Sequence, residues 1–163
     1  MNYYHAITAV YESIPEDSII MGEGANTMDI GRTILQTVHP RHRLDAGSFG
    51  TMGVGFGQMI AAKACNPEKQ VVGVMGDSAF GFSCMELETA SRYKLPMVVV
   101  IINNNGIFTG TETLPDDPKQ VGVTYLNPDT RYEMLADAMG GKGYNAKTID
   151  EVKAAVKDAL ASN

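Results

Sequence analysis

Two polar segments, each directly after an apolar run, carry the residue types best suited to binding a divalent cation. Asp77 follows the run Val71 to Met75, and Asn104 follows the run Met97 to Ile102. In an open parallel sheet, ligands bind at the carboxyl ends of the strands, so these two side chains would emerge at one edge. Mg²⁺ prefers such oxygen ligands together with substrate phosphates. We therefore expect Asp77, Asn104 and a backbone carbonyl near Gly106 to bind Mg²⁺.

A purely structural role for both segments is the alternative interpretation. Asp77 would then cap the residues that follow it, and Asn103, Asn104 and Asn105 would form a turn after the strand, which is common for both residue types. The two segments together are more specific than either alone. The glycines around them permit the backbone to approach a diphosphate, and the amides at the start of a helix after Asp77 would face it.

The elements that must position these residues alternate between strands and helices. The two apolar runs predict buried parallel strands, because they are short and rich in Val and Ile. Between them, Ser83 to Pro96 predicts a helix with a capping box made by Ser83 and Glu86. We expect further helices at Tyr3 to Ser13, Val54 to Ala64 and Arg131 to Met139, the last with a left-handed cap at Gly140, and a final helix capped by Thr148 and Glu151. We expect further strands at Ser18 to Met21 and Gly143 to Ala146, and a long loop from Thr109 to Asn127. This alternation indicates an α/β fold with a doubly wound, mostly parallel sheet and helices on both faces.

Composition excludes several classes of protein. The 163 residues are 44% hydrophobic and 20% charged, with a net charge of -6, which is typical of one globular domain and unfavourable for binding nucleic acid. The N-terminal sequence does not resemble a signal peptide, and no segment has the roughly 18 to 20 apolar residues of a membrane span. Cys65 and Cys84 lack metal-ligand spacing. We expect a reduced, soluble, cytoplasmic protein with no membrane partner.

The sequence around these motifs resembles a known family. GDSAFGFS (76–83) and NNNGI (103–107) are similar to the thiamin-diphosphate fingerprint of oxalyl-CoA decarboxylase and its relative 2-hydroxyacyl-CoA lyase. The resemblance continues through EGANTMDIGR (23–32), PRHRLDAGSFGTMGVGFG (40–57), MELETASRYKLP (85–96) and GGKGY (140–144). It covers nearly the whole chain and implies that residues 1–163 are the diphosphate-binding domain of a thiamin-diphosphate enzyme.

The resemblance also implies roles for individual residues. It assigns the Mg²⁺ ligands to Asp77, Asn104 and the carbonyl of Gly106. Met52 would lie beneath the cofactor and keep it bent, although without the resemblance a core methionine would be the better interpretation. The backbone of Gly50 would accept a hydrogen bond from the aminopyrimidine. The implied cofactor-binding residues are Ala25, Asn26, Thr27, Gly50, Met52, Asp77, Ser78, Ala79, Asn104, Gly106 and Ile107.

A basic cluster lies between these motifs. Arg32, Arg41 and Arg43, with His39 and His42, are not interrupted by acidic residues along the sequence between 32 and 43. Arginine binds phosphate through paired donors, and the resemblance places Arg32 near the nucleotide of coenzyme A. For Arg41 and Arg43, a solvent-exposed surface position without a ligand is an equally good interpretation. The histidines show neither triad nor metal spacing.

The resemblance implies decarboxylation of oxalyl-CoA to formyl-CoA and carbon dioxide. We place this activity ahead of 2-hydroxyacyl-CoA cleavage because the segment from Gly106 to Arg131 is short, as in the decarboxylases. In the family the glutamate that activates the cofactor lies in another domain, so we assign no catalytic residue here. We expect a fragment or single-domain subunit that is active only with a pyrimidine-binding domain, on a coenzyme A thioester, and that forms a homo-oligomer in the complete enzyme.

Two other classes of function remain open. The chain could be a non-catalytic assembly module that retains the cofactor site, or a flavodoxin-like or nicotinamide-binding domain. The run Gly53 to Gly57 has its third glycine too early for a dinucleotide loop, which disfavours the last of these. A eukaryotic lyase would place the protein in peroxisomes instead of the cytoplasm.

Overall fold

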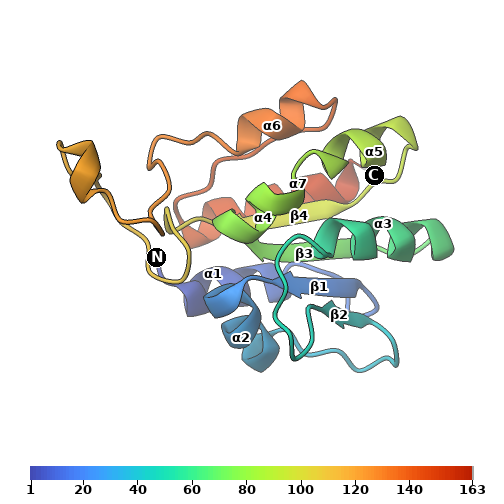
Figure 1. Ribbon diagram of the computed structural model, residues 1–163. Coiled ribbons are helices and arrows are strands. Elements are labelled where there is room, and N and C mark those ends of the chain that lie inside the picture. Colours follow the sequence, from blue (N-terminus) through green and yellow to red (C-terminus); the bar gives the residue numbers. More distant parts are fainter. Residues whose placement is uncertain (163) are drawn as a thin grey trace.

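A parallel sheet of four strands in the order β2-β1-β3-β4 forms the centre of the computed structural model, which describes residues 1–162 (Figure 1). The strands are β1 (Ile19–Glu23), β2 (Arg43–Asp45), β3 (Val71–Gly76) and β4 (Val98–Ile102). Every residue of β3 is buried, which explains its continuous apolar sequence. The mostly parallel sheet expected from the sequence is confirmed.

Helices cover both faces of the sheet. One face is covered by α1 (Tyr3–Tyr11), α2 (Ala25–Ile34) and α7 (Ile149–Ala161). The other is covered by α3 (Gly55–Cys65), α4 (Asp77–Ser83), α5 (Glu86–Arg92) and α6 (Glu133–Ala138), and a short 3-10 helix, η1, spans Pro118–Gln120 in the long loop. Within residues 1–162, each helix is too short or too polar to cross a membrane.

Alternation along the strands divides the core into two clusters. Val72 and Val74 of β3 point to the α1 and α7 side, where they pack with Ile7 and Val156. Val71 and Met75 point to the opposite side, where the packing partners include Phe56 and Phe80. Because side chains of a strand alternate between faces, β1, β3 and β4 each contribute to both clusters, whereas the short β2 contributes Leu44 to the second cluster only.

The helix predicted between the two apolar runs is wrong in its first turn. α4 begins directly at Asp77 and continues to Ser83, so Ser83 ends one helix and cannot cap the next. α5 begins at Glu86 after Met85, which makes no side-chain capping bond, and the buried Ser83 hydroxyl has no hydrogen-bond partner in the described chain. The break between the two short helices falls at Cys84 and Met85, where the sequence has no Gly or Pro to mark it.

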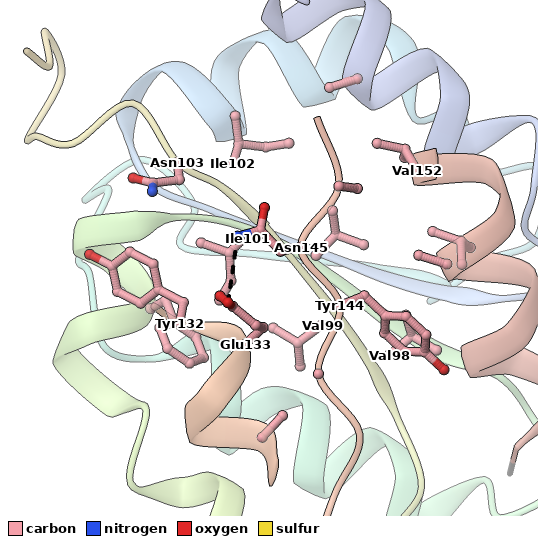
Figure 2. Close-up of a pocket in the computed structure, with 18 of the residues that line it drawn as sticks. Val98, Val99, Ile101, Ile102, Asn103, Tyr132, Glu133, Tyr144, Asn145 and Val152 are labelled. Carbon is pink, nitrogen blue, oxygen red and sulfur yellow. Dashed lines mark hydrogen bonds between the residues drawn. The ribbon is translucent and has the colours of Figure 1, made fainter. Parts of the chain in front are cut away.

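Two other elements differ from expectation. The short edge strand β2 was not predicted, because three residues with a half-exposed pattern carry little hydrophobic signal. The segment 143–146 was expected as a strand but forms none, although Gly140 has the expected left-handed φ of 83°. Val98 to Ile102 and this segment both line a cavity of about 440 Å³ (Figure 2). Among residues 1–162 no strand pairs with the outer edge of β4, and the cavity occupies the space beside that edge.

The capping box at the start of α7 is confirmed and gives a test of stability. The Thr148 hydroxyl accepts the N–H of Glu151, and the Glu151 carboxylate accepts the N–H of Thr148. We expect Thr148→Ala to lower the free energy of unfolding by about 1 kcal/mol, because it leaves a helix N–H without its acceptor. Urea unfolding measures the change. Lys157→Ala, at an exposed position of the same helix, is the control and is expected to change stability by less than about 0.5 kcal/mol. Equal effects of the two substitutions would contradict a stabilising cap.

Candidate functional site

The carboxyl ends of three neighbouring strands form the site. Parallel register pairs Glu23 of β1 with Met75 of β3, and Gly76 of β3 with Ile102 of β4. The segments that follow these strands therefore begin side by side at one edge of the sheet, where the sequence analysis expects a ligand. We call this edge the rim; it comprises residues 23–27, 50–55, 76–79 and 103–108.

Asp77 is the buried acid of the rim. Its side chain is 2% exposed, and Oδ1 accepts the N–H of Ser78 at 2.8 Å while Oδ2 accepts the N–H of Gly106 at 3.0 Å. Burial raises the pKa of Asp77, and the backbone N–H groups around it lower that pKa in part. No Lys or Arg in residues 1–162 pairs with this carboxyl, so its charge has dipoles but no cation as partners.

The segment after β4 folds back on itself at the rim. Asn104 and Asn26 both donate from Nδ2 to the carbonyl oxygen of Phe108, at 3.1 and 2.7 Å. Asn105 and Phe108 have positive φ angles of 62° and 65°. A Cβ on Gly110 would lie only 1.5 Å from the carbonyl oxygen of Asn104, so this tight fold requires glycine there. These contacts bring two of the expected cofactor-binding segments together.

The starts of α2 and α4 pack closely against each other. Gly24 has a φ of 101°, and a Cβ there would lie 3.3 Å from the Gly76 amide nitrogen and 3.5 Å from the Ala79 side chain. Thr27 Oγ1 lies at a similar distance from a Cβ built on Gly76. The structure therefore brings Ala25 to Thr27 beside Ser78 and Ala79. Helix N-termini present unpaired N–H groups and favour anions, so this junction suits a phosphate group.

The segment that carries Gly50 and Met52 borders the same junction. The Ser78 hydroxyl lies 3.6 Å from Met52 Sδ, which joins two of the predicted residues. Gly50 has a φ of 61°, and a Cβ there would meet no atom within 4 Å. Met52 is therefore not a core methionine, which was the interpretation favoured without the resemblance; it is half-buried beside α4. Ile107, also half-buried, donates its N–H to the Thr124 carbonyl within the long loop.

Three residues near the rim had no predicted role. Glu23 is fully buried at the end of β1. Tyr3 and Tyr132 lie close enough to Asp77 for its charge to raise their pKa values, an effect second to burial for both. Both tyrosines come from segments more than 50 positions from Asp77 in the chain, so no local pattern could reveal them. Glu23 belongs to the EGAN motif but had been given no function.

The basic cluster is arranged differently from the expectation of phosphate donors. Arg32 Nε lies 3.1 Å from Asp45 Oδ2, and Arg32 also contacts Asp29 and the carbonyl of Gly47. Arg43 lies 3.9 Å from the same Asp45 oxygen. Arg32 and Arg43 thus come together around a carboxylate, whereas Arg41 is exposed and makes none of these contacts. A role for Arg32 in binding coenzyme A remains a prediction.

The donor set of the rim fits a hard divalent cation. No three His, Cys, Asp or Glu side chains in residues 1–162 converge to hold a metal, so a metal here depends on oxygens of another kind. Asp77 supplies a carboxylate without a cation partner, and the Asn104 amide and the Gly106 carbonyl belong to the segment that donates to it. One carboxylate plus neutral oxygens leaves coordination positions for phosphate, which is the usual arrangement for Mg²⁺. The buried Asn105 Oδ1, which has no partner in the described chain, lies in the same segment.

A parallel α/β domain whose strand ends form a polar rim, suited to an anion and a divalent cation, is the class that these features define. The model of the family described as thiamine pyrophosphate enzyme, C-terminal TPP binding domain, matches residues 22–163, and the chain belongs to this family. It is 49% identical to 2-hydroxyacyl-CoA lyase 1 of Mus musculus over 98% of the chain and 30% of that protein. It is 42% identical to oxalyl-CoA decarboxylase of Escherichia coli K12, over 99% of the chain and 29% of that protein.

A solved structure shows the same fold. The thiamine diphosphate-dependent 4-hydroxybenzoylformate decarboxylase of Rhodococcus jostii RHA1 superposes with a TM-score of 0.80 at 23% identity, over 99% of this chain and 30% of the other. The chain spans about 30% of the length of the curated relatives described above.

Buried carboxyls at the rim give a test of pH dependence. Burial raises the pKa of Glu23 above its ordinary value of 4.5, so the folded chain binds its proton more tightly than the unfolded chain does. The stability from this group is complete below pH 4.5 and is lost as the pH rises through the folded pKa. Asp45 has the opposite shift, caused first by the Arg32 side chain, and its contribution is lost only as the pH falls below 3.8.

We expect the free energy of unfolding to rise as the pH is lowered from about 7 to about 5, and to rise less in Glu23→Gln. Urea unfolding at several pH values measures both slopes. Glu86→Gln, at an exposed position, is the control and should keep the wild-type slope. A wild-type slope in Glu23→Gln would contradict the raised pKa of this carboxyl.

Proposed function

We propose that this chain is the diphosphate-binding domain of a thiamin-diphosphate-dependent lyase that breaks a carbon-carbon bond in a coenzyme A thioester. The observation that carries the proposal is the convergence at one rim of Asp77, the Asn104 to Gly106 backbone, and the start of α2 in a chain of the thiamine pyrophosphate enzyme family. Because the chain spans about 30% of its relatives' length, a pyrimidine-binding domain or subunit is the proposed partner.

In this proposal the residues of the chain hold and orient the cofactor. Asp77, Asn104 and the carbonyl of Gly106 hold Mg²⁺, and the amides at the starts of α2 and α4 bind the diphosphate. Met52 supports the rings, since it lies beside Ser78 at the edge of the same junction. Bound thiamin diphosphate supplies the nucleophile and the electron sink for carbon-carbon cleavage.

The residues of the chain that would contact diphosphate make no direct acid or base contribution. Asp77 is fully buried and already accepts two backbone N–H groups, which suits a metal ligand more than a proton carrier. The glutamate that activates the cofactor is proposed to come from the partner domain. The isolated chain is therefore inactive in this proposal, and a complete active site forms only in the assembled enzyme.

Oxalyl-CoA decarboxylase is the specific activity that we propose. The match to the Escherichia coli decarboxylase extends over 164 aligned positions, close to the 163 residues of the chain. The match to the mouse lyase extends over 172 positions, so that lyase carries residues that this chain lacks, and we propose that they fall in the short segment from Gly106 to Arg131. Cleavage of a 2-hydroxyacyl-CoA is the second candidate, favoured by the higher identity of 49% to that lyase.

Reconstitution tests the activity. The chain is mixed with a separately produced pyrimidine-binding domain from a relative, with Mg²⁺ and thiamin diphosphate, and is supplied with oxalyl-CoA or a 2-hydroxyacyl-CoA. We expect carbon dioxide and formyl-CoA from the first substrate, at a higher kcat/KM than aldehyde release from the second. Turnover by the chain without the added domain would contradict the missing glutamate, and cleavage of neither thioester by the assembled pair would overturn the proposed activity.

The metal assignment has its own test. We expect Asp77→Asn to weaken Mn²⁺ binding in the presence of pyrophosphate by more than about 100-fold, because loss of outer-shell partners alone costs 10- to 100-fold. Electron paramagnetic resonance of free Mn²⁺ measures the binding. Asp150→Asn, at an exposed position in the first turn of α7, is the control and should bind Mn²⁺ like the wild type. Wild-type affinity in Asp77→Asn would show that the metal is not held by this carboxylate.

A further inference from the structure

Glu23 is a buried carboxyl that joins β1 to a segment 30 positions away. Its side chain is 0% exposed, and Oε1 alone accepts three backbone N–H groups: those of Gly53 at 2.7 Å, Val54 at 2.8 Å and Gly55 at 3.1 Å. Oε2 is buried and has no partner in the described chain. A carboxyl that caps a helix normally lies at the N-cap itself, but here Val54 makes no side-chain capping bond and the acceptor comes from the sheet.

The segment that Glu23 holds has few other attachments. It begins near Gly47, whose carbonyl accepts a hydrogen bond from Arg32, and its middle carries Phe49, which is 96% exposed. Between Gly47 and Gly53, three glycines have positive φ angles, so the backbone itself is permissive and does not define one path. Met52 Sδ accepts the Ser78 hydroxyl at 3.6 Å, and a thioether sulfur is a weak acceptor. The three bonds to Glu23 are therefore the strongest constraint on where Met52 lies.

The backbone packs closely against the Glu23 carboxyl. A Cβ on Gly55 would lie 2.7 Å from Glu23 Oε2 and 2.4 Å from the Met21 methyl group, so the start of α3 approaches the carboxyl as closely as glycine allows. Burying a carboxyl costs free energy that a solvent-exposed capping side chain would not cost. Glu23 is nevertheless buried, at the edge of the rim. A residue at 23 that is shorter, or that carries no oxygen at the position of Oε1, would leave up to three N–H groups at the start of α3 without an acceptor.

We propose that Glu23 is a positioning residue: it clamps the segment 50–55 and so sets Met52 against the rings of the bound cofactor, without contacting the diphosphate. This inference rests on the proposed function, because it needs thiamin diphosphate as the ligand. It separates the rim into two parts. Asp77, Ser78 and Gly106 serve the metal and diphosphate, whereas Glu23 acts only through Met52 on the ring end.

The experiment is a titration of the 163-residue chain observed by NMR, with amide resonances and the methionine methyl groups as probes. Two ligands are compared, Mg²⁺ with inorganic pyrophosphate and Mg²⁺ with thiamin diphosphate. In the wild type we expect Ser78 and Gly106 amides to shift with both ligands, and the Met52 methyl group to shift with thiamin diphosphate only. In Glu23→Leu, which has no acceptor for the three N–H groups, we expect the amide shifts with pyrophosphate to persist within about twofold in affinity, and the Met52 shift with thiamin diphosphate to be lost.

Two further variants make the test specific. Met52→Ala has no Met52 methyl group, so it is scored by affinity at the Ser78 and Gly106 amides: it should lose the excess of thiamin diphosphate affinity over pyrophosphate affinity. The double variant with Glu23→Leu should be no weaker than Met52→Ala alone, because the two residues act in series. Thr148→Ala serves as a control for reduced stability far from the rim and should keep the wild-type response. If Glu23→Leu does not fold, Glu23→Asp, which keeps the charge and shortens its reach, replaces it.

The outcomes separate the inference from the proposed function. A Met52 response to thiamin diphosphate in the Glu23 variants equal to that of the wild type would overturn the positioning role and leave the proposed function intact. Loss of both pyrophosphate and thiamin diphosphate binding in a folded Glu23 variant would also overturn it, since Glu23 would then serve the whole rim. No shift at Ser78 or Gly106 with either ligand in the wild type would overturn the proposed function itself.

Discussion

The hydrogen bond from the Gly106 amide to Asp77 is the constraint on which the rim depends. It joins the end of β3 to the segment after β4 at 3.0 Å, in a place where water is excluded. A buried carboxylate is costly unless it is paired, and backbone dipoles compensate its charge only in part, as the raised pKa of Asp77 shows. The same bond orients the Asn104 to Gly106 backbone, so the acid and the neutral oxygens offered to a cation are positioned by one contact.

Unusual backbone conformations gather at this contact. Four residues other than glycine have positive φ angles in residues 1–162, and two of them, Asn105 and Phe108, lie in the rim. Such conformations cost free energy, and they persist when surrounding contacts determine them, often at functional sites. Here the contacts are visible: Asn26 and Asn104 both donate to the Phe108 carbonyl. The strained turn after β4 is therefore held by Asn26 at the start of α2 and by Asn104 within the turn itself.

Much of the fold was predictable from the sequence, because its signals are local. Val71 to Met75 is apolar throughout and became the fully buried β3, and Thr148 with Glu151 carries its own capping bonds. The convergence of Asp77 with the asparagine-rich segment followed from the parallel order of the strands. The predictions that failed depended on signals that are weak or that come from residues distant in the chain. Ser83 has the residue type of a helix cap, but it is the last residue of α4. Glu23 could not be assigned, because its partners lie about 30 positions away and are backbone groups with no side-chain signature.

The two ends of the rim are built by different physics. At the metal end, Asp77 follows the central strand β3, and the segment that carries Gly106 follows the edge strand β4, which pairs with β3 at five positions. The sheet therefore fixes where both segments begin, and the hydrogen bond from Gly106 to Asp77 joins them. At the other end, Met52 lies on an irregular segment with left-handed glycines and an exposed phenylalanine, attached chiefly through one buried carboxyl. The two ends of the rim thus depend on different contacts: the paired strands and the bond from Gly106 to Asp77 position the metal end, whereas the ring end depends on the bonds to Glu23. This clamping role explains why Glu23 is buried although its Oε2 has no partner in the described chain, since a cap made for stability alone would not require burial.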